Sequence, residues 1–90
     1  MSMTNAERQS LKARANALKS TIFIGREGLT PAILDMIRIA LQKTDLIKVR
    51  IRAEDAESAN ELARSAAQAV PCELVALRGR VAILHRIATD

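Results

Sequence analysis

The alternation of apolar and polar residues predicts seven short elements along this 90-residue chain. Apolar residues at helical spacing indicate three helices, and runs that alternate or are rich in β-branched residues indicate four strands. The helices are expected at about 5–18, 31–43 and 56–70, and the strands at about 21–24, 46–52, 73–77 and 81–86.

Capping residues mark where the three helices begin. Thr4 stands three residues before Glu7, which is the spacing of a capping box. Thr30 precedes Pro31, whose missing N–H costs nothing in a first helical turn. Asp55 is placed to cap the third helix.

The spacing of apolar residues also predicts which side of each helix is buried. The short strand at 21–24 is expected to be buried as a whole, including its aromatic residue. The buried helical positions are Leu11, Ala15 and Leu18, then Ile33, Leu34, Ile37, Ala40 and Leu41, and finally Ala59, Leu62, Ala63, Ala66 and Val70.

The order α-β-α-β-α-β-β predicts one α/β domain over residues 1–90, with a four-stranded mixed sheet and three helices. The two helical crossovers imply parallel strands, and a closing hairpin around Arg78-Gly79-Arg80 adds an antiparallel one. In the strand at 46–52, alternate residues are apolar and face the core. The residues between them are basic and share the other face, about 7 Å apart; they are Lys48, Arg50 and Arg52. This spacing is near the phosphate repeat of an extended nucleic acid, and the alternative is a solvent-exposed sheet face whose charges serve solubility.

The composition limits the chemistry that this chain can perform. It has one Phe and neither Tyr nor Trp, which argues against nucleic-acid binding by aromatic stacking. With one Cys and one His it can form neither an internal disulfide nor a Cys/His zinc site. Cys72 is expected to fill core space, and His85 to be a partly buried strand residue. No catalytic grouping is found, so we expect no enzymatic activity, no cofactor and no small-molecule substrate.

The same features bear on localisation. A lone cysteine fits a reducing compartment, and the first twelve residues contain no apolar stretch of the kind found in a signal peptide. The longest uninterrupted apolar runs have four residues, too few to cross a bilayer. We therefore expect a cytoplasmic protein without membrane association.

The net charge of +4 is unevenly distributed. Residues 1–52 carry ten basic and four acidic side chains, a balance of +6, whereas residues 53–77 carry one against five, a balance of −4. Residues 78–90 return to +2. This pattern is either scatter on a solvated surface or a bipolar domain, with a basic face for a polyanion and an acidic flank held away from it.

The quartet Gly25-Arg26-Glu27-Gly28 lies between the first strand and the second helix. Two glycines let the backbone adopt positive φ and approach a ligand closely, and the N–H groups that begin a helix attract anions. Arg26 adds forked donors suited to phosphate, whereas Glu27 would repel it. The alternative is that the glycines only ease a strand-to-helix turn.

Further basic side chains either extend such a site or serve solubility alone. They lie at the hairpin tip, at the end of the last strand, and on or after the first helix. These candidates are Arg78, Arg80, Arg86, Lys12 and Lys19.

Four segments together resemble the YhbY family, whose domain is called CRM, for chloroplast RNA splicing and ribosome maturation. They are Ile24-Gly25-Arg26-Glu27-Gly28-Leu29-Thr30, Ala40-Leu41, Leu46-Ile47-Lys48-Val49-Arg50-Ile51, and Gly79-Arg80 leading to Leu84-His85-Arg86. The chain departs from the family pattern at Glu27, usually neutral or small, at His85, usually Tyr, and at Ile87, usually Pro.

The resemblance implies a fold similar to the C-terminal domain of translation initiation factor three. It also implies RNA binding through the glycine loop, as in KH domains, with Gly25, Arg26, Gly28, Lys48, Arg50 and Arg86 as the matching residues. Plant members act in group II intron splicing, and single-domain bacterial members, which this chain resembles in size, in assembly of the large ribosomal subunit.

We therefore expect a monomeric RNA-binding protein that contacts the phosphate backbone of structured RNA. The RNA would be large-subunit ribosomal RNA or a pre-ribosomal particle, and base readout would be slight. The alternative is a protein-interaction module of the ribosome or RNA machinery that docks through its acidic third helix.

Overall fold

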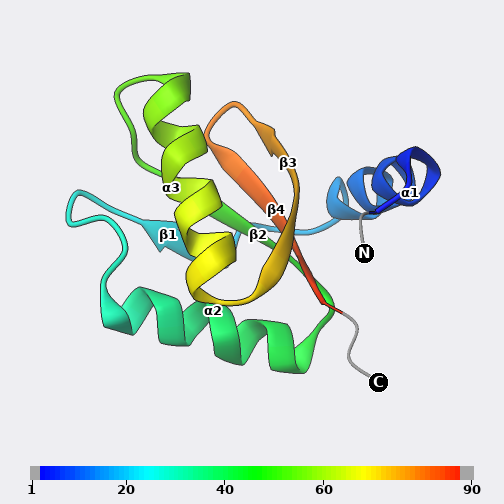
Figure 1. The fold of residues 1–90 in the computed structure, drawn as a ribbon, viewed down its shortest axis with the longest axis horizontal. Helices are drawn as coiled ribbons and strands as arrows, with labels where there is room; N and C mark the ends of the chain where they lie inside the picture. The colour runs from blue at the N-terminus through cyan, green and yellow to red at the C-terminus, as the bar shows by residue number, and fades with distance from the viewer. Residues whose placement is uncertain (1–2, 88–90) are drawn as a thin grey trace.

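The computed structural model describes residues 3–87, which form the three helices and four strands in the predicted order (Figure 1). The mixed α/β fold expected from the sequence is confirmed. The helices are α1 (Asn5–Ala15), α2 (Pro31–Lys43) and α3 (Ala56–Ala69), and the strands are β1 (Ile22–Ile24), β2 (Leu46–Ile51), β3 (Cys72–Arg78) and β4 (Val81–Arg86).

All three predicted helix starts are confirmed. Thr4 Oγ1 accepts a hydrogen bond from the Glu7 N–H at 3.1 Å, and the Glu7 carboxylate accepts from the Thr4 N–H at 3.2 Å. Thr30 Oγ1 accepts from an N–H in the first turn of α2 at 3.2 Å. Asp55 Oδ1 does the same for α3 at 2.8 Å. Each cap satisfies a backbone donor that the helix itself leaves unpaired.

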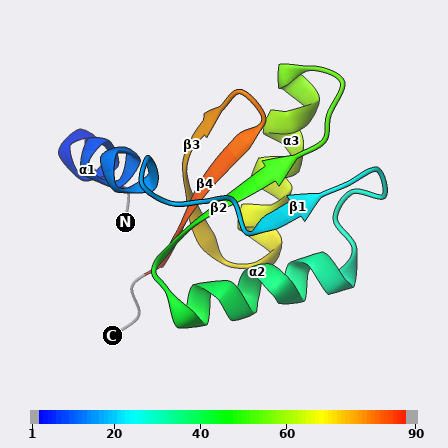
Figure 2. The ribbon, with the colours of Figure 1, turned by 180° about the vertical axis from the view of Figure 1, so that it is seen from behind.

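The strands form one sheet in the order β1-β2-β4-β3. β1 is parallel to β2, and β4 runs antiparallel to both of its neighbours. The chain crosses from β2 through α3 to β3 and then returns through the hairpin, which inserts β4 between them. As a result the C-terminal ends of β1, β2 and β3 lie at the same end of the sheet (Figure 2).

One face of the sheet packs against α2 and α3 and holds the main core. The predicted inward face of β2 is confirmed, because all three of its alternating apolar residues are buried. The small residues of α3 let this helix approach the sheet closely. The cluster includes Ile24, Ile47, Val49, Ile51 and Leu84 from the strands, Ile37 and Leu41 from α2, and Ala59, Ala63 and Ala66 from α3.

The opposite face of the sheet is covered only in part, by α1. Leu11 and Ala15 pack there against Leu46, Val75 and Ile83. Figure 2 shows this face, with α1 at one side and the portion of the sheet near β1 left uncovered. The sheet is therefore asymmetric, with a closed side and a half-open side.

Two sequence-based expectations about this side are wrong. The first helix ends at Ala15 rather than near Leu18, whose side chain is 37% exposed. Lys48 Nζ donates to the Leu18 carbonyl at 3.1 Å, so the chain beyond the helix is held to the sheet by a contact distant in sequence. Phe23, expected to be buried, is 52% exposed, because β1 is an edge strand and α1 does not reach it.

Candidate functional site

The loop between β1 and α2 is closed by its two glycines. The Gly28 N–H donates to the Gly25 carbonyl at 3.1 Å, and Gly28 has a φ of +74°. Gly25 does not have a positive φ, so only one of the two loop glycines adopts the conformation expected from the sequence. Within residues 3–87 the N–H groups of Arg26 and Glu27 make no hydrogen bond. The turn thus leaves two adjacent backbone donors at its tip.

The first turn of α2 offers fewer donors than the sequence suggested. Pro31 has no N–H. The Ile33 N–H donates to Thr30 Oγ1 at 3.2 Å, and the Leu34 N–H donates to the Thr30 carbonyl at 3.0 Å. The amides that remain for an anion are therefore mainly those of the loop, and the helix contributes its dipole.

Basic residues from three segments lie at the loop end of the sheet. The Arg52 N–H donates to the Ile24 carbonyl at 2.8 Å, which places Arg52 next to the start of the loop. Arg80 at the hairpin turn donates through Nε to the Ala53 carbonyl at 3.2 Å. Together with Arg26 on the loop, these two residues form what we call the basic end.

A row of four residues crosses the half-open face next to the basic end. Phe23 is paired in register with Arg50, Arg50 with Val81, and Val81 with Arg78. Residues paired directly across neighbouring strands point to the same side of a sheet. We call this set the open row; it spans all four strands, about 14 Å at the usual strand spacing.

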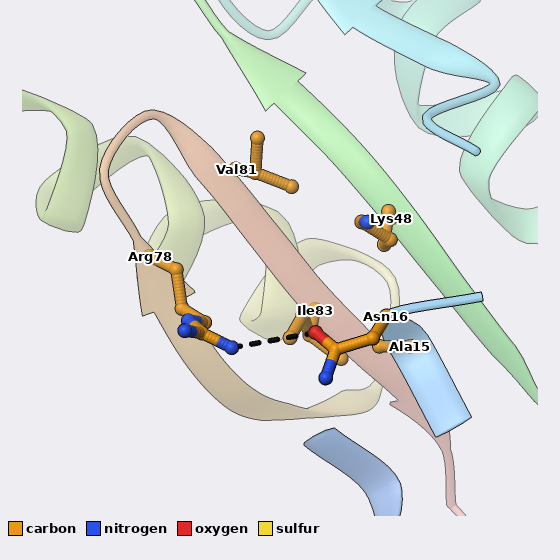
Figure 3. Close-up of a pocket in the computed structure, with 6 residues that line it drawn as sticks. All are labelled: Ala15, Asn16, Lys48, Arg78, Val81 and Ile83. Atoms are coloured by element: carbon orange, nitrogen blue, oxygen red, sulfur yellow. Dashed lines mark hydrogen bonds between the residues drawn. The ribbon is translucent and has the colours of Figure 1, made fainter. Parts of the chain in front are cut away.

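A shallow hollow of ≈ 230 Å³ lies between the open row and the end of α1 (Figure 3). Lys48 and Arg78 line it from opposite sides, with Val81 and Ile83 at its floor. Arg78 Nη1 donates to Asn16 Oδ1 at 3.4 Å, and Lys48 Nζ bonds to the Leu18 carbonyl. An ammonium carries three N–H donors and a guanidinium five, so each side chain retains donors for a ligand.

The remaining basic candidates divide between the hollow and the far end of the molecule. Lys12 lies one helical turn before Asn16, on the same side of α1, and Lys19 is exposed in the segment that follows α1. Arg86 lies elsewhere, since its Nη1 donates to the Leu41 carbonyl at 3.0 Å, at the C-terminal end of α2. The structure does not bring Arg86 near the glycine loop.

The acidic segment lies closer to the loop than expected. A Cβ on Gly28 would lie 4.0 Å from Leu62 Cδ2, so α3 packs directly behind the loop. Asp55 at the start of α3 has a lowered pKa, chiefly because it accepts the hydrogen bond from the Ser58 N–H, with a smaller effect from the charge of Arg80. The sheet separates α3 from the open row. The acidic helix α3 is therefore held away from the open row, as expected, but not from the glycine loop.

Other candidate chemistry is limited in the part of the chain that is described. No group of three or more His, Cys, Asp or Glu side chains that could hold a metal ion occurs among residues 3–87. Cys72 is buried as predicted, and the loss of solvation raises the pKa of its thiol to about 11. His85, partly buried as predicted, has Nε2 3.5 Å from Asp45 Oδ2. Within the same residues, no helix has the length and apolar character needed to cross a membrane.

Comparison with known proteins identifies the family. Residues 3–86 match the model of the CRS1 / YhbY (CRM) domain. The chain belongs to this family. The match covers all seven elements, which confirms the resemblance stated from the four sequence segments.

Individual relatives agree with this assignment. A Haemophilus influenzae protein named as an RNA-binding protein is 27% identical over 84 residues, which are 93% of this chain and 85% of that one. A Methanocaldococcus jannaschii protein named as a probable RNA-binding protein is 31% identical over 86 residues, and the match spans 63% of its length. A Staphylococcus aureus protein of known solution structure, described as a candidate RNA-binding protein, has the same fold. Its TM-score is 0.86 at 24% identity, over 99% of this chain and 93% of that one.

Proposed function

We propose that this CRM domain binds structured RNA through its phosphate backbone and assists assembly of the large ribosomal subunit. The observation that supports the proposal is that the glycine loop and the basic end lie at one end of the sheet, next to the cations of the open row on its half-open face. The names of the two sequence relatives support RNA as the ligand.

The chemistry of this surface suits phosphate groups. The free N–H groups of Arg26 and Glu27 can donate to one phosphate, and the Arg26 guanidinium can add two parallel hydrogen bonds. Lys48 and Arg50 lie on β2 and Arg52 directly follows it; the spacing of about 7 Å between alternate strand residues suits successive phosphates. Such contacts carry little base information, so the shape of the RNA would determine where the domain binds.

The dependence of RNA affinity on salt tests the phosphate contacts. If some four to six phosphates are engaged, the logarithm of affinity falls against that of salt concentration with a slope of roughly −3 to −4. The substitution Arg26→Ala should weaken binding to all RNA sequences alike and reduce the slope by about 1. Arg38→Ala removes a charge on α2 that is paired with Asp35 at 2.6 Å and serves as the matched control. A flat salt response contradicts the proposal.

Sedimentation of a cell lysate tests the ribosomal part of the proposal. We expect the protein to migrate with large-subunit precursors in low salt and to leave them in high salt, with Arg26→Ala shifting the release to lower salt. Migration only with free protein argues against it. If association with ribosomal proteins survives both nuclease and Arg26→Glu, the acidic α3 rather than the basic surface is the docking element.

A further inference from the structure

The proposed phosphate contacts do not involve the exposed ring of Phe23. It is the only aromatic residue of the Phe, Tyr and Trp type in the chain, and 52% of it is exposed in the middle of β1. Most of the large apolar residues of the strands are buried, so the exposed ring of Phe23 is an exception among them. An apolar ring on a basic face calls for a ligand that has both apolar and anionic parts.

The ring lies between the glycine loop and the cations of the open row. A Cβ on Gly25 would lie 3.5 Å from Phe23 Cε2, so the ring edge extends over a residue that has no side chain. On the other side, Arg50 is the direct register partner on β2, about 4.8 Å away across the sheet. A strand of nucleic acid leaving the loop would pass across the ring.

The charges around the ring favour one kind of occupant. Lys48, Arg50 and Arg78 lie on this face, and the open row contains no acidic residue. The acidic α3 packs on the other face of the sheet. A flat apolar group beside a row of cations is complementary to unpaired nucleotides, whose bases stack on aromatic rings while their phosphates bind Arg and Lys.

We propose that the open row and the neighbouring Lys48 bind an unpaired segment of RNA, with one base stacked on Phe23 and the adjoining phosphates on Arg50 and Lys48. This inference rests on the proposed function and narrows its ligand to RNA with an unpaired nucleotide beside the backbone held by the loop. The low aromatic content argues against stacking as a mode of binding, but one exposed ring is enough to stack on one base.

A single tryptophan can report the stacked base. Phe23→Trp introduces the only Trp of the chain at an exposed site, so the fold should tolerate it. We expect its fluorescence to be quenched by an RNA hairpin with one bulged adenosine, and much less by the same hairpin fully paired. Ile39→Trp is the matched control, because Ile39 is 50% exposed on α2, and its fluorescence should not change.

Affinity measurements separate stacking from phosphate binding. Phe23→Leu, which keeps an apolar side chain, should lower affinity for the bulged hairpin about tenfold and leave the paired hairpin unchanged. Phe23→Tyr, which keeps an aromatic ring, should retain the wild-type preference for the bulged hairpin. Arg26→Ala should weaken binding to both hairpins.

Two other outcomes are distinguishable. If wild-type protein binds both hairpins and Phe23→Leu changes neither affinity, stacking is overturned, RNA binding stands, and the ring is left to an apolar partner such as a protein. If the wild type binds neither hairpin at low salt, the proposed function and the stacking fail together.

Discussion

Gly28 is the loop residue whose backbone conformation restricts which amino acid can occupy the position. Its φ of +74° lies in the left-handed region, which residues with a Cβ rarely adopt. Space is not the restriction, because a Cβ would meet only Leu62 Cδ2 at 4.0 Å. Gly25 lacks a positive φ, so the two glycines of the same motif have different physical requirements.

Replacing each glycine by alanine tests this difference. Gly28→Ala should lower the free energy of unfolding by about 1 kcal/mol, the cost of forcing an L residue into the left-handed region. Gly25→Ala places its Cβ at an ordinary contact distance and should change stability by a few tenths of a kcal/mol at most. Urea unfolding of both variants measures the two values, and equal losses would contradict the distinction.

At the residue scale, the sequence predicts which residues can bind an anion better than it predicts which side chains are exposed to solvent. The glycine loop and the basic residues of β2 are visible in the pattern, and the structure brings Arg26, Arg52 and Arg80 to one end. The exposure of Phe23 is not visible, since it depends on how much of the second sheet face α1 covers. No local sequence pattern indicates how far α1 extends over the sheet.

At the scale of elements, α1 is attached to the sheet by polar contacts as well as apolar ones. Arg14 donates to both carboxylate oxygens of Asp45, at 2.8 and 3.2 Å, and His85 lies against the same carboxylate. Asp45 immediately precedes β2. This one carboxylate therefore connects a helix, the start of a central strand and the end of β4.

The pH dependence of stability tests this connection. The Arg14 guanidinium lowers the pKa of Asp45, so folding favours the deprotonated carboxylate. Its contribution is full at pH values well above the ordinary Asp pKa of about 3.9 and is lost as pH falls through the lower folded pKa. Asp45→Asn should cost about 0.5 kcal/mol at pH 7, and the difference from wild type should vanish near pH 2.

A second ion pair provides the control for this experiment. Asp35 pairs with Arg38 three residues on, within α2, and 67% of the Asp35 side chain is exposed. Asp35→Asn should have a smaller effect at pH 7, because no second element depends on the pair. If both variants behave alike, Asp45 does not hold α1 to the sheet.

The starts of the helices can be predicted from the sequence, whereas the end of α1 cannot. All three helix starts are set by side chains within three residues, so Thr4, Thr30 and Asp55 are recognised from the sequence alone. The end of α1 is instead associated with Lys48 and Arg78, which contact the chain at 18 and 16 from distant strands. Periodicity extends the helix to Leu18 because it contains nothing about those strands.

At the scale of the whole molecule, the basic residues at the two ends of the sheet have different surroundings. The glycine loop, Arg52 and the hairpin turn lie at one end. Arg86 lies at the other, where it donates to carbonyls of Leu41 and Gln42 that α2 leaves unpaired. A cation at a helix C-terminus also interacts favourably with the helix dipole.

Substitutions at the two ends should therefore separate stability from binding. Arg86→Ala should lower the free energy of unfolding by about 1 kcal/mol while leaving the salt dependence of RNA affinity unchanged. Arg26→Ala, on an exposed loop, should do the reverse. Thermal unfolding and RNA titration of both variants give the four values required, and a loss of RNA affinity in folded Arg86→Ala would return this residue to the binding surface.

The contact between α1 and β3 has a consequence for the order of folding. The Arg8 guanidinium donates to the Leu74 and Val75 carbonyls, beside an irregularity in the β3 ladder, and Leu74 follows Arg8 by 66 residues. A contact that closes so long a segment depends on strands made late in the chain. We expect α1 to dock last and to detach first in transient openings. Each detachment would extend the open face of the sheet while the α2 and α3 side stays intact.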